Sequence, residues 1–136
     1  MTIFEQIINR EIPAYIIYED DLVISFLDIS QVTKGHTLVV TKKVYKDIFE
    51  IPEETLKHLI AVTKHISEAI NKALKPEGIN LLNNNGETAG QEVMHYHMHI
   101  IPRYQKNDVI FKFTNNIDST KKEEYEKRAN VIRAAL

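Results

Sequence analysis

The segment His95-Tyr96-His97-Met98-His99-Ile100-Ile101 alternates histidine with apolar residues. Successive side chains of a β-strand point to opposite faces, so this spacing predicts a strand over Val93–Ile101, ended by Pro102, with three imidazoles on one face. A chain with 6 histidines in 136 residues would contain such a triplet by chance only about once in a hundred. The triplet therefore calls for a structural or chemical explanation.

Hydrophobic periodicity on both sides of this segment predicts an α+β domain. Thr2 and Glu5 form a capping-box pattern before a short helix that runs to about Arg10. The hairpin-like pair Tyr15–Tyr18 and Val23–Leu27 is expected to be antiparallel. The remaining predicted elements are strands at His36–Thr41 and Ile79–Leu82, a long helix from Pro52 to Leu74, and a C-terminal helix over Ser119–Leu136 capped by Ser119 or Thr120.

Composition restricts the class of protein. At 136 residues with 43% hydrophobic residues, the chain is expected to form one domain over residues 1–136. It has no cysteine, which excludes thiol catalysis, cysteine zinc sites and disulfides. A net charge of −2 gives no general attraction to nucleic acid or to a membrane surface, and no binding to either is expected. Charged residues interrupt the N-terminal apolar stretch, so a cytoplasmic protein is predicted.

Three explanations of the histidine triplet follow from its chemistry. The histidines could occupy the solvated face of an ordinary strand. They could bind a metal ion, because imidazole suits zinc, copper, iron or nickel, with Glu92 as the carboxylate nearest in sequence. They could instead act on a phosphate ester or amide, with one neutral imidazole as nucleophile and the others as hydrogen-bond donors. Neighbouring imidazolium charges repel, which keeps at least one ring neutral near pH 7.

His95–Ile101 resembles the signature of the histidine triad (HIT) family of nucleotide hydrolases and transferases. Other segments resemble the same family in the same order and extend the match over about residues 3–103. These segments are Ile3-Phe4, Glu11-Ile12-Pro13-Ala14, Tyr18-Glu19-Asp20-Asp21, Phe26-Leu27-Asp28-Ile29, Gly35-His36-Thr37-Leu38-Val39-Val40, Gly90-Gln91-Glu92-Val93-Met94 and Ile101-Pro102-Arg103. The last part of the chain, residues 104–136, matches no motif and is expected to be a C-terminal extension.

The resemblance implies a HIT-like α+β fold with an antiparallel sheet, assembled as a homodimer. It also implies a catalytic role for each of four histidines. His97 would attack the α-phosphorus of a nucleotide and form a covalent nucleotidyl-histidine intermediate, which water then hydrolyses to release the nucleoside monophosphate. His99 would contact the phosphate oxygens, His95 would support the nucleophile, and His36 would pack behind the triplet. A phosphate above His97 is expected to meet both His95 and His99.

By the same resemblance, further residues would bind the nucleotide. Asp28 would accept hydrogen bonds from the ribose hydroxyls. Asn84 stands where Hint-like members have Asn and diadenosine polyphosphate hydrolases typically have Gln, and Gly90 would let the backbone approach the phosphate. The base would be enclosed by Ile3, Phe4, Ile7, Phe26 and Ile29, and the phosphate by Asn84, Gly90, Gln91, Glu92 and Val93, with the amides of Glu92 and Val93 as oxyanion donors.

Three features that distinguish this chain from other members or branches of the family refine the expectation. Glu92 stands where many Hint-like enzymes have Ser, which changes the group facing the leaving group. The absence of Cys predicts no structural zinc, and His99 in place of Gln argues against the hexose-1-phosphate uridylyltransferase branch. The predicted activity is hydrolysis of purine nucleoside 5′-phosphoramidates (AMP or GMP derivatives) without a required metal or cofactor. The alternatives are a dinucleoside polyphosphate hydrolase, a low-turnover nucleotide-binding regulatory protein and a metal-binding protein.

Overall fold

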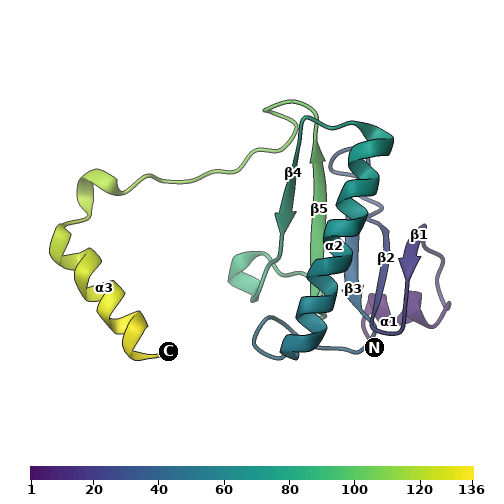
Figure 1. Cartoon of the computed structure of the whole chain (residues 1–136), viewed down its shortest axis with the longest axis horizontal. Helices are drawn as coiled ribbons and strands as arrows, with labels where there is room; N and C mark the ends of the chain where they lie inside the picture. The colour runs from purple at the N-terminus through teal and green to yellow at the C-terminus, as the bar shows by residue number, and fades with distance from the viewer.

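The computed structural model of the chain describes all residues from 1 to 136 and contains one five-stranded antiparallel sheet (Figure 1). The strands lie in the order β1-β2-β3-β5-β4. In chain order the elements are α1 (Ile3–Ile8), β1 (Ile16–Glu19), β2 (Val23–Leu27), β3 (Thr37–Thr41), α2 (Glu53–Leu74), β4 (Gly78–Leu82), a 3₁₀ turn (Glu87–Ala89), β5 (His97–Arg103), a second 3₁₀ turn (Ile117–Ser119) and α3 (Lys122–Ala134). The predicted fold class is confirmed.

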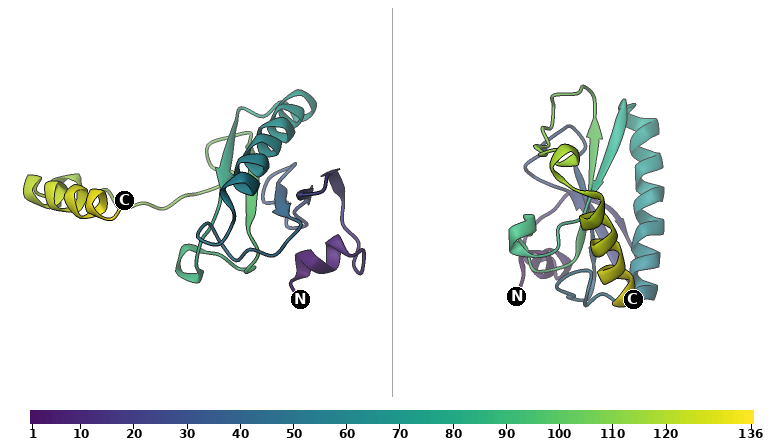
Figure 2. Two further views of the ribbon diagram at one scale, coloured as in Figure 1. Left: turned by 60° about the horizontal axis from the view of Figure 1, so that its bottom comes forward. Right: turned by 90° about the vertical axis from the view of Figure 1, so that its left-hand side faces the viewer.

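A hydrophobic core lies on each face of the sheet. The helix α1, which precedes the first three strands, packs on one face, and α2, which follows them, packs on the other. Along β3, Val39 points to the α2 face, where it joins Leu59 and Ile66 of α2. Leu38 and Val40 point the other way and join the α1 side chains Phe4 and Ile7. This alternation is the period-two pattern of a strand that is buried on both faces. Figure 2 shows α1 and α2 on opposite sides of the sheet.

The strand at the histidine triplet is displaced toward the C-terminus from its predicted bounds. It begins at His97 instead of Val93, because the backbone N–H of Tyr96 donates to the Tyr45 carbonyl outside the sheet. It also continues through Pro102 to Arg103. Pro102 is tolerated because β3 pairs with β5 only as far as Ile100, so the missing N–H faces a position beyond the end of β3.

The C-terminal part of the chain leaves the sheet and ends in a helix that stands apart from it on the β4 side (Figures 1 and 2). The helix α3 begins at Lys122, so the prediction that Ser119 or Thr120 caps it is wrong. Ser119 belongs to the preceding 3₁₀ turn, and the Thr120 hydroxyl donates to the Asn116 carbonyl. No helix in the structure has the length and apolar character needed to cross a bilayer.

Candidate functional site

A cavity of about 530 Å³ opens on the α1 face of the sheet and gathers most of the predicted site residues. It lies over the N-terminal part of β3 and over β5 from His97 to Ile101, beside the loop that follows β4. Its lining consists of Phe4, Asp28, Ser30, Val32, His36, Leu38, Leu82, Asn84, Gly90, Glu92, Val93, His97, His99, Ile101, Val109 and Phe111. Histidines, two carboxylate side chains and apolar side chains therefore meet around one space.

The ring of His97 is held in one tautomer. Its Nδ1 lies 2.7 Å from the backbone carbonyl oxygen of His95, and a carbonyl only accepts, so Nδ1 carries the proton. The other ring nitrogen, Nε2, is therefore unprotonated when the ring is neutral. It has no partner in the chain and is not among the fully buried unpaired atoms. The edge of the ring that faces the cavity presents a lone pair, which is the requirement for a nucleophile.

His99 and His36 form a second pair whose tautomers follow from Asp28. His36 Nε2 lies 3.0 Å from Nδ1 of His99 and 3.8 Å from an Asp28 carboxylate oxygen, which favours a proton on His36 Nε2. His36 then donates to His99, so that His99 carries its own proton on Nε2. This arrangement leaves His36 Nδ1 as a bare lone pair, in agreement with its burial without a partner. His99 thus offers an N–H to the cavity.

All of these imidazoles are neutral at pH 7. Burial lowers the pKa of His97, and the nearby carboxylates of Asp28 and Glu92 only partly oppose it. Burial, together with repulsion from His97 and His36, lowers the pKa of His99 to about 4. Burial likewise lowers the pKa of His36. An unprotonated His97 beside a neutral N–H donor is therefore the normal state of the site.

His95 does not line the cavity, which corrects the expectation that a phosphate above His97 meets both His95 and His99. It precedes β5 and is completely buried, with Nδ1 2.9 Å from the Thr2 hydroxyl and Nε2 2.7 Å from the Thr41 carbonyl. Both ring nitrogens are thus occupied, and the ring cannot reach a phosphate or a metal. Its carbonyl nevertheless orients His97, so His95 supports that ring through its backbone.

Asp28 lies at the junction of two cavities. A smaller apolar cavity of about 160 Å³ shares Phe4, Asp28 and Leu38 with the larger one. The predicted base-enclosing residues Ile3, Phe4, Ile7, Phe26 and Ile29 all line this smaller cavity. An apolar slot, a carboxylate and a histidine cluster therefore follow one another in the order of the base, ribose and phosphate of a nucleotide.

Ser30 fixes the Asp28 carboxylate. Its backbone N–H and hydroxyl donate to Oδ1 of Asp28 at 2.8 and 2.7 Å, which leaves Oδ2 toward His36. Burial opposes ionisation of Asp28, but the two hydrogen bonds from Ser30 and the adjacent imidazoles outweigh it and lower the pKa of the carboxyl. A charged acceptor is thus available at the junction of the two cavities.

The loop after β4 supplies one wall of the larger cavity. Asn84, Gly90, Glu92 and Val93 line it, and the Asn84 amide donates to the Gly90 carbonyl at 3.2 Å. The backbone N–H groups of Glu92 and Val93 have no acceptor within the chain.

Gln91 lies outside the cavity, although it was predicted to bind the nucleotide. It is buried and holds the loop by accepting from Gly86 N–H and donating to the carbonyls of Lys46 and Val93.

Several residues of the site were not identified from the sequence. Ser30 could have been, because an Asp followed two residues later by Ser is typical of a turn in which the carboxylate accepts from that serine. The role of Thr2 was recognised only as a helix cap, whereas the hydroxyl also contacts His95. Val109 and Phe111 carry no local signal, because they reach the cavity only through the path of the chain after β5.

The residues that could hold a metal ion together are not the three histidines of the triplet. Asp28, His36 and His99 each offer one ligand atom, and these atoms lie within 4.8 Å of one another. His95 cannot join such a set because both of its ring nitrogens are hydrogen-bonded.

Comparison with known proteins shows close relatives. A model described as HIT domain matches residues 9–106. "Protein hit" of Bacillus subtilis is 53% identical over 106 residues, which cover 78% of this chain and 73% of that protein. "Adenylylsulfatase HINT3" of Arabidopsis thaliana is 38% identical over 105 residues, covering 77% of this chain and 53% of that protein.

Two crystal structures resemble the whole chain. A HIT family member from Bacillus subtilis superposes with a TM-score of 0.94 at 45% identity, and the match covers 99% of this chain and 96% of that one. A HIT family protein from Bacillus anthracis gives 0.92 at 44% identity, covering 98% of this chain and 96% of that one.

Proposed function

The chain belongs to the HIT family, and on that premise we propose that it hydrolyses purine nucleoside 5′-phosphoramidates and related nucleotidyl compounds, with His97 as the nucleophile. The observation that carries the proposal is the hydrogen bond from Nδ1 of His97 to the His95 carbonyl, which leaves Nε2 unprotonated toward the cavity. The order of apolar slot, carboxylate and histidine cluster supports a nucleotide as the ligand.

The reaction proceeds in two displacements at the α-phosphorus. In the first, the lone pair on Nε2 of His97 forms a bond to phosphorus while the P–N bond to the leaving group breaks, and the amine departs with a proton taken up from the site or solvent. In the second, water attacks the same phosphorus, loses a proton, and the bond to Nε2 breaks. The products are the amine and the nucleoside monophosphate, and His97 regains its starting state.

Other residues stabilise the charge that develops on the phosphate oxygens. The Nε2–H of His99 and the free backbone N–H groups of Glu92 and Val93 donate to these oxygens. No step of this reaction requires a metal or cofactor. The Oδ2 atom of Asp28 accepts from the ribose, while the slot lined by Phe26 and Ile7 encloses the base.

Glu92 favours a leaving group that is an amine. A carboxylate on the cavity wall repels an anionic leaving group such as a second phosphate, whereas it attracts a protonated amine. The name of the Arabidopsis relative, an adenylylsulfatase, supports an adenylyl group as the part of the substrate that is retained.

The test is hydrolysis of adenosine 5′-phosphoramidate and of diadenosine polyphosphates, both in the presence of a chelator, by the wild type and His97→Ala. The proposal predicts phosphoramidate cleavage that the chelator leaves intact and that His97→Ala abolishes. Faster cleavage of the diadenosine compounds would assign the chain to the polyphosphate hydrolases. Turnover that disappears in chelator would establish a metal enzyme, and binding of AMP without turnover on either substrate would indicate a regulatory nucleotide-binding protein.

A further inference from the structure

The hydrogen bond from Nδ1 of His97 to the His95 carbonyl fixes only one atom of the His97 ring. A ring held at one atom can still tilt, and a tilt moves Nε2 out of the line of attack on phosphorus. Two neighbouring rings restrict this tilt. The Phe4 ring meets the His97 ring nearly edge to face, with centroids 5.0 Å apart and planes at 74°, and the His99 centroid lies 5.0 Å away at 59°. The plane of the His97 ring is therefore set by these two neighbours.

Phe4 connects the apolar slot to this ring. It lines both cavities and is only 5% exposed. Its ring also meets two other rings edge to face, with a centroid distance of 5.7 Å to Phe26 of the slot and 5.5 Å to His95. A group that enters the slot therefore packs against a side chain that is itself in contact with His97.

The helix that carries Phe4 is bonded to the histidine segment through its N-cap. Nε2 of His95 lies 2.7 Å from the Thr41 carbonyl, which only accepts, so Nε2 carries the proton and Nδ1 accepts from the Thr2 hydroxyl at 2.9 Å. The same hydroxyl accepts from the backbone N–H of Glu5 and caps α1. Thr2 thus fixes the start of α1 to the residue whose carbonyl holds His97, and Phe4 follows two residues later.

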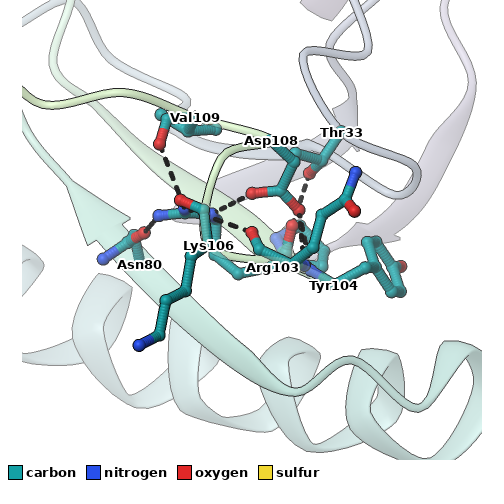
Figure 3. Close-up of polar contacts among 9 residues, drawn as sticks. Thr33, Asn80, Arg103, Tyr104, Lys106, Asp108 and Val109 are labelled. Atoms are coloured by element: carbon teal, nitrogen blue, oxygen red, sulfur yellow. Dashed lines mark hydrogen bonds and ion pairs between the residues drawn. The ribbon is translucent and has the colours of Figure 1, made fainter.

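A second wall of the larger cavity is held by a separate network (Figure 3). The Arg103 guanidinium at the end of β5 pairs with Asp108 and donates to Asn80 Oδ1 of β4 at 2.7 Å. It also donates to the Val109 carbonyl at 3.0 Å. None of the bonds made by Arg103 involves an imidazole. Of these two walls, the one formed by α1 is therefore the one that is bonded to the histidine segment.

We infer that Phe4 is a positioning residue for His97, and that a base bound in the apolar slot strengthens the hold of Phe4 on that ring. The inference rests on the proposed function and extends it, because the base then contributes to the rate of the chemical step as well as to binding. Binding energy from a part of the substrate remote from the reacting bond is used to orient the nucleophile. The site accordingly selects complete nucleotides through kcat as well as through KM.

The kinetic test compares Phe4→Leu with Phe26→Leu, the same substitution at two neighbouring rings of the slot, in hydrolysis of adenosine 5′-phosphoramidate. Both substitutions remove an aromatic contact to the base, so both should raise KM. Phe4→Leu alone should also lower kcat, by about 10- to 100-fold, because His97 is no longer held in line with phosphorus. Phe4→Met, which refills the volume without a ring edge, should behave like Phe4→Leu. An unchanged kcat in both Phe4 variants would show that Phe4 only binds the base.

A spectroscopic test needs no turnover, so its result is separate from the fate of the proposed activity. Nitrogen-15 NMR of the histidine rings near neutral pH reports which nitrogen of His97 carries the proton. The wild type and Phe26→Leu should show a protonated Nδ1 and an unprotonated Nε2. In Phe4→Leu the two nitrogen signals should move toward each other, because the ring leaves the His95 carbonyl and samples both tautomers.

Adenosine serves as the probe of the coupling between the slot and His97, because it fills the slot without bringing a phosphate. Added adenosine should sharpen the His97 ring signals of the wild type and leave those of Phe4→Leu unchanged. His97 signals that are identical in the wild type and in Phe4→Leu, both with and without adenosine, would overturn the inference.

Discussion

Acid should destabilise this protein through its buried imidazoles, and His99 allows the effect to be calculated. An imidazole whose pKa is 6.5 in the unfolded chain and about 4 in the folded one binds more protons when unfolded. Stability is therefore complete above pH 6.5 and falls as the pH drops toward 4. Between pH 7.5 and 5.0 this pKa shift lowers the free energy of unfolding by at most about 2 kcal/mol, and solvent screening of the partly exposed ring reduces that loss to about 1–2 kcal/mol.

The perturbation that isolates this contribution is His99→Gln, which keeps a polar side chain but does not titrate. Urea unfolding followed by far-ultraviolet circular dichroism, at one fixed protein concentration, gives the free energy of unfolding of both proteins at pH 7.5 and 5.0. The wild type should lose more stability than the variant over this interval, by about 1–2 kcal/mol. The remaining acid sensitivity of the variant comes from His36, His95 and His97, whose pKa values are also lowered by burial. Equal losses in the two proteins would refute the burial of a neutral His99.

Three further substitutions test other parts of the structure. Thr2→Val removes both the helix cap and the hydrogen-bond partner of His95, and it should lower the free energy of unfolding by about 2–3 kcal/mol. In the same urea assay, Thr2→Ser should retain most of the wild-type free energy of unfolding. Gly35→Ala should cost about 2–3 kcal/mol, because Gly35 has φ +93° and a Cβ would lie 2.5 Å from the Leu74 side chain, whereas Gly78→Ala, with open space around it, serves as the neutral control in thermal unfolding. Asp28→Ala should raise KM for a ribonucleotide substrate by about 10- to 100-fold and leave KM for its 2′,3′-dideoxy analogue nearly unchanged. An equal rise in KM for both substrates would show that Asp28 does not bind the ribose hydroxyls.

Local patterns in the sequence were sufficient for most of the fold. The capping box at Thr2 and the β-prone composition of Val23–Leu27 each depend on neighbours in sequence, and the structure has both elements where they were predicted. The bounds of β5 depend on the register with β3 and on the bond from Tyr96 to Tyr45, which are long-range contacts. For the same reason the position of α3, apart from the sheet on the β4 side, could not be predicted from its own helical periodicity.

The site shows the same division between local and long-range information. The alternation of His97 and His99 on one strand face was readable from spacing alone, and the cavity does contain both. The exclusion of His95 from the cavity could not be predicted from spacing, because it results from long-range hydrogen bonds. Thr2 lies 93 residues and Thr41 lies 54 residues from His95 in the sequence. The wall formed by Val109 and Phe111 depends on the turn after Arg103, for which the sequence has no family pattern.

The most direct test of the central claim, that His97 becomes covalently bonded to phosphorus, is the stereochemistry of hydrolysis. The substrate is one diastereomer of an adenosine 5′-phosphoramidothioate, cleaved in oxygen-18 water, and the configuration of the labelled product is determined by phosphorus NMR. Each in-line displacement inverts phosphorus, so two displacements through a nucleotidyl-histidine predict overall retention. Inversion would mean that water attacks phosphorus directly and would contradict the account.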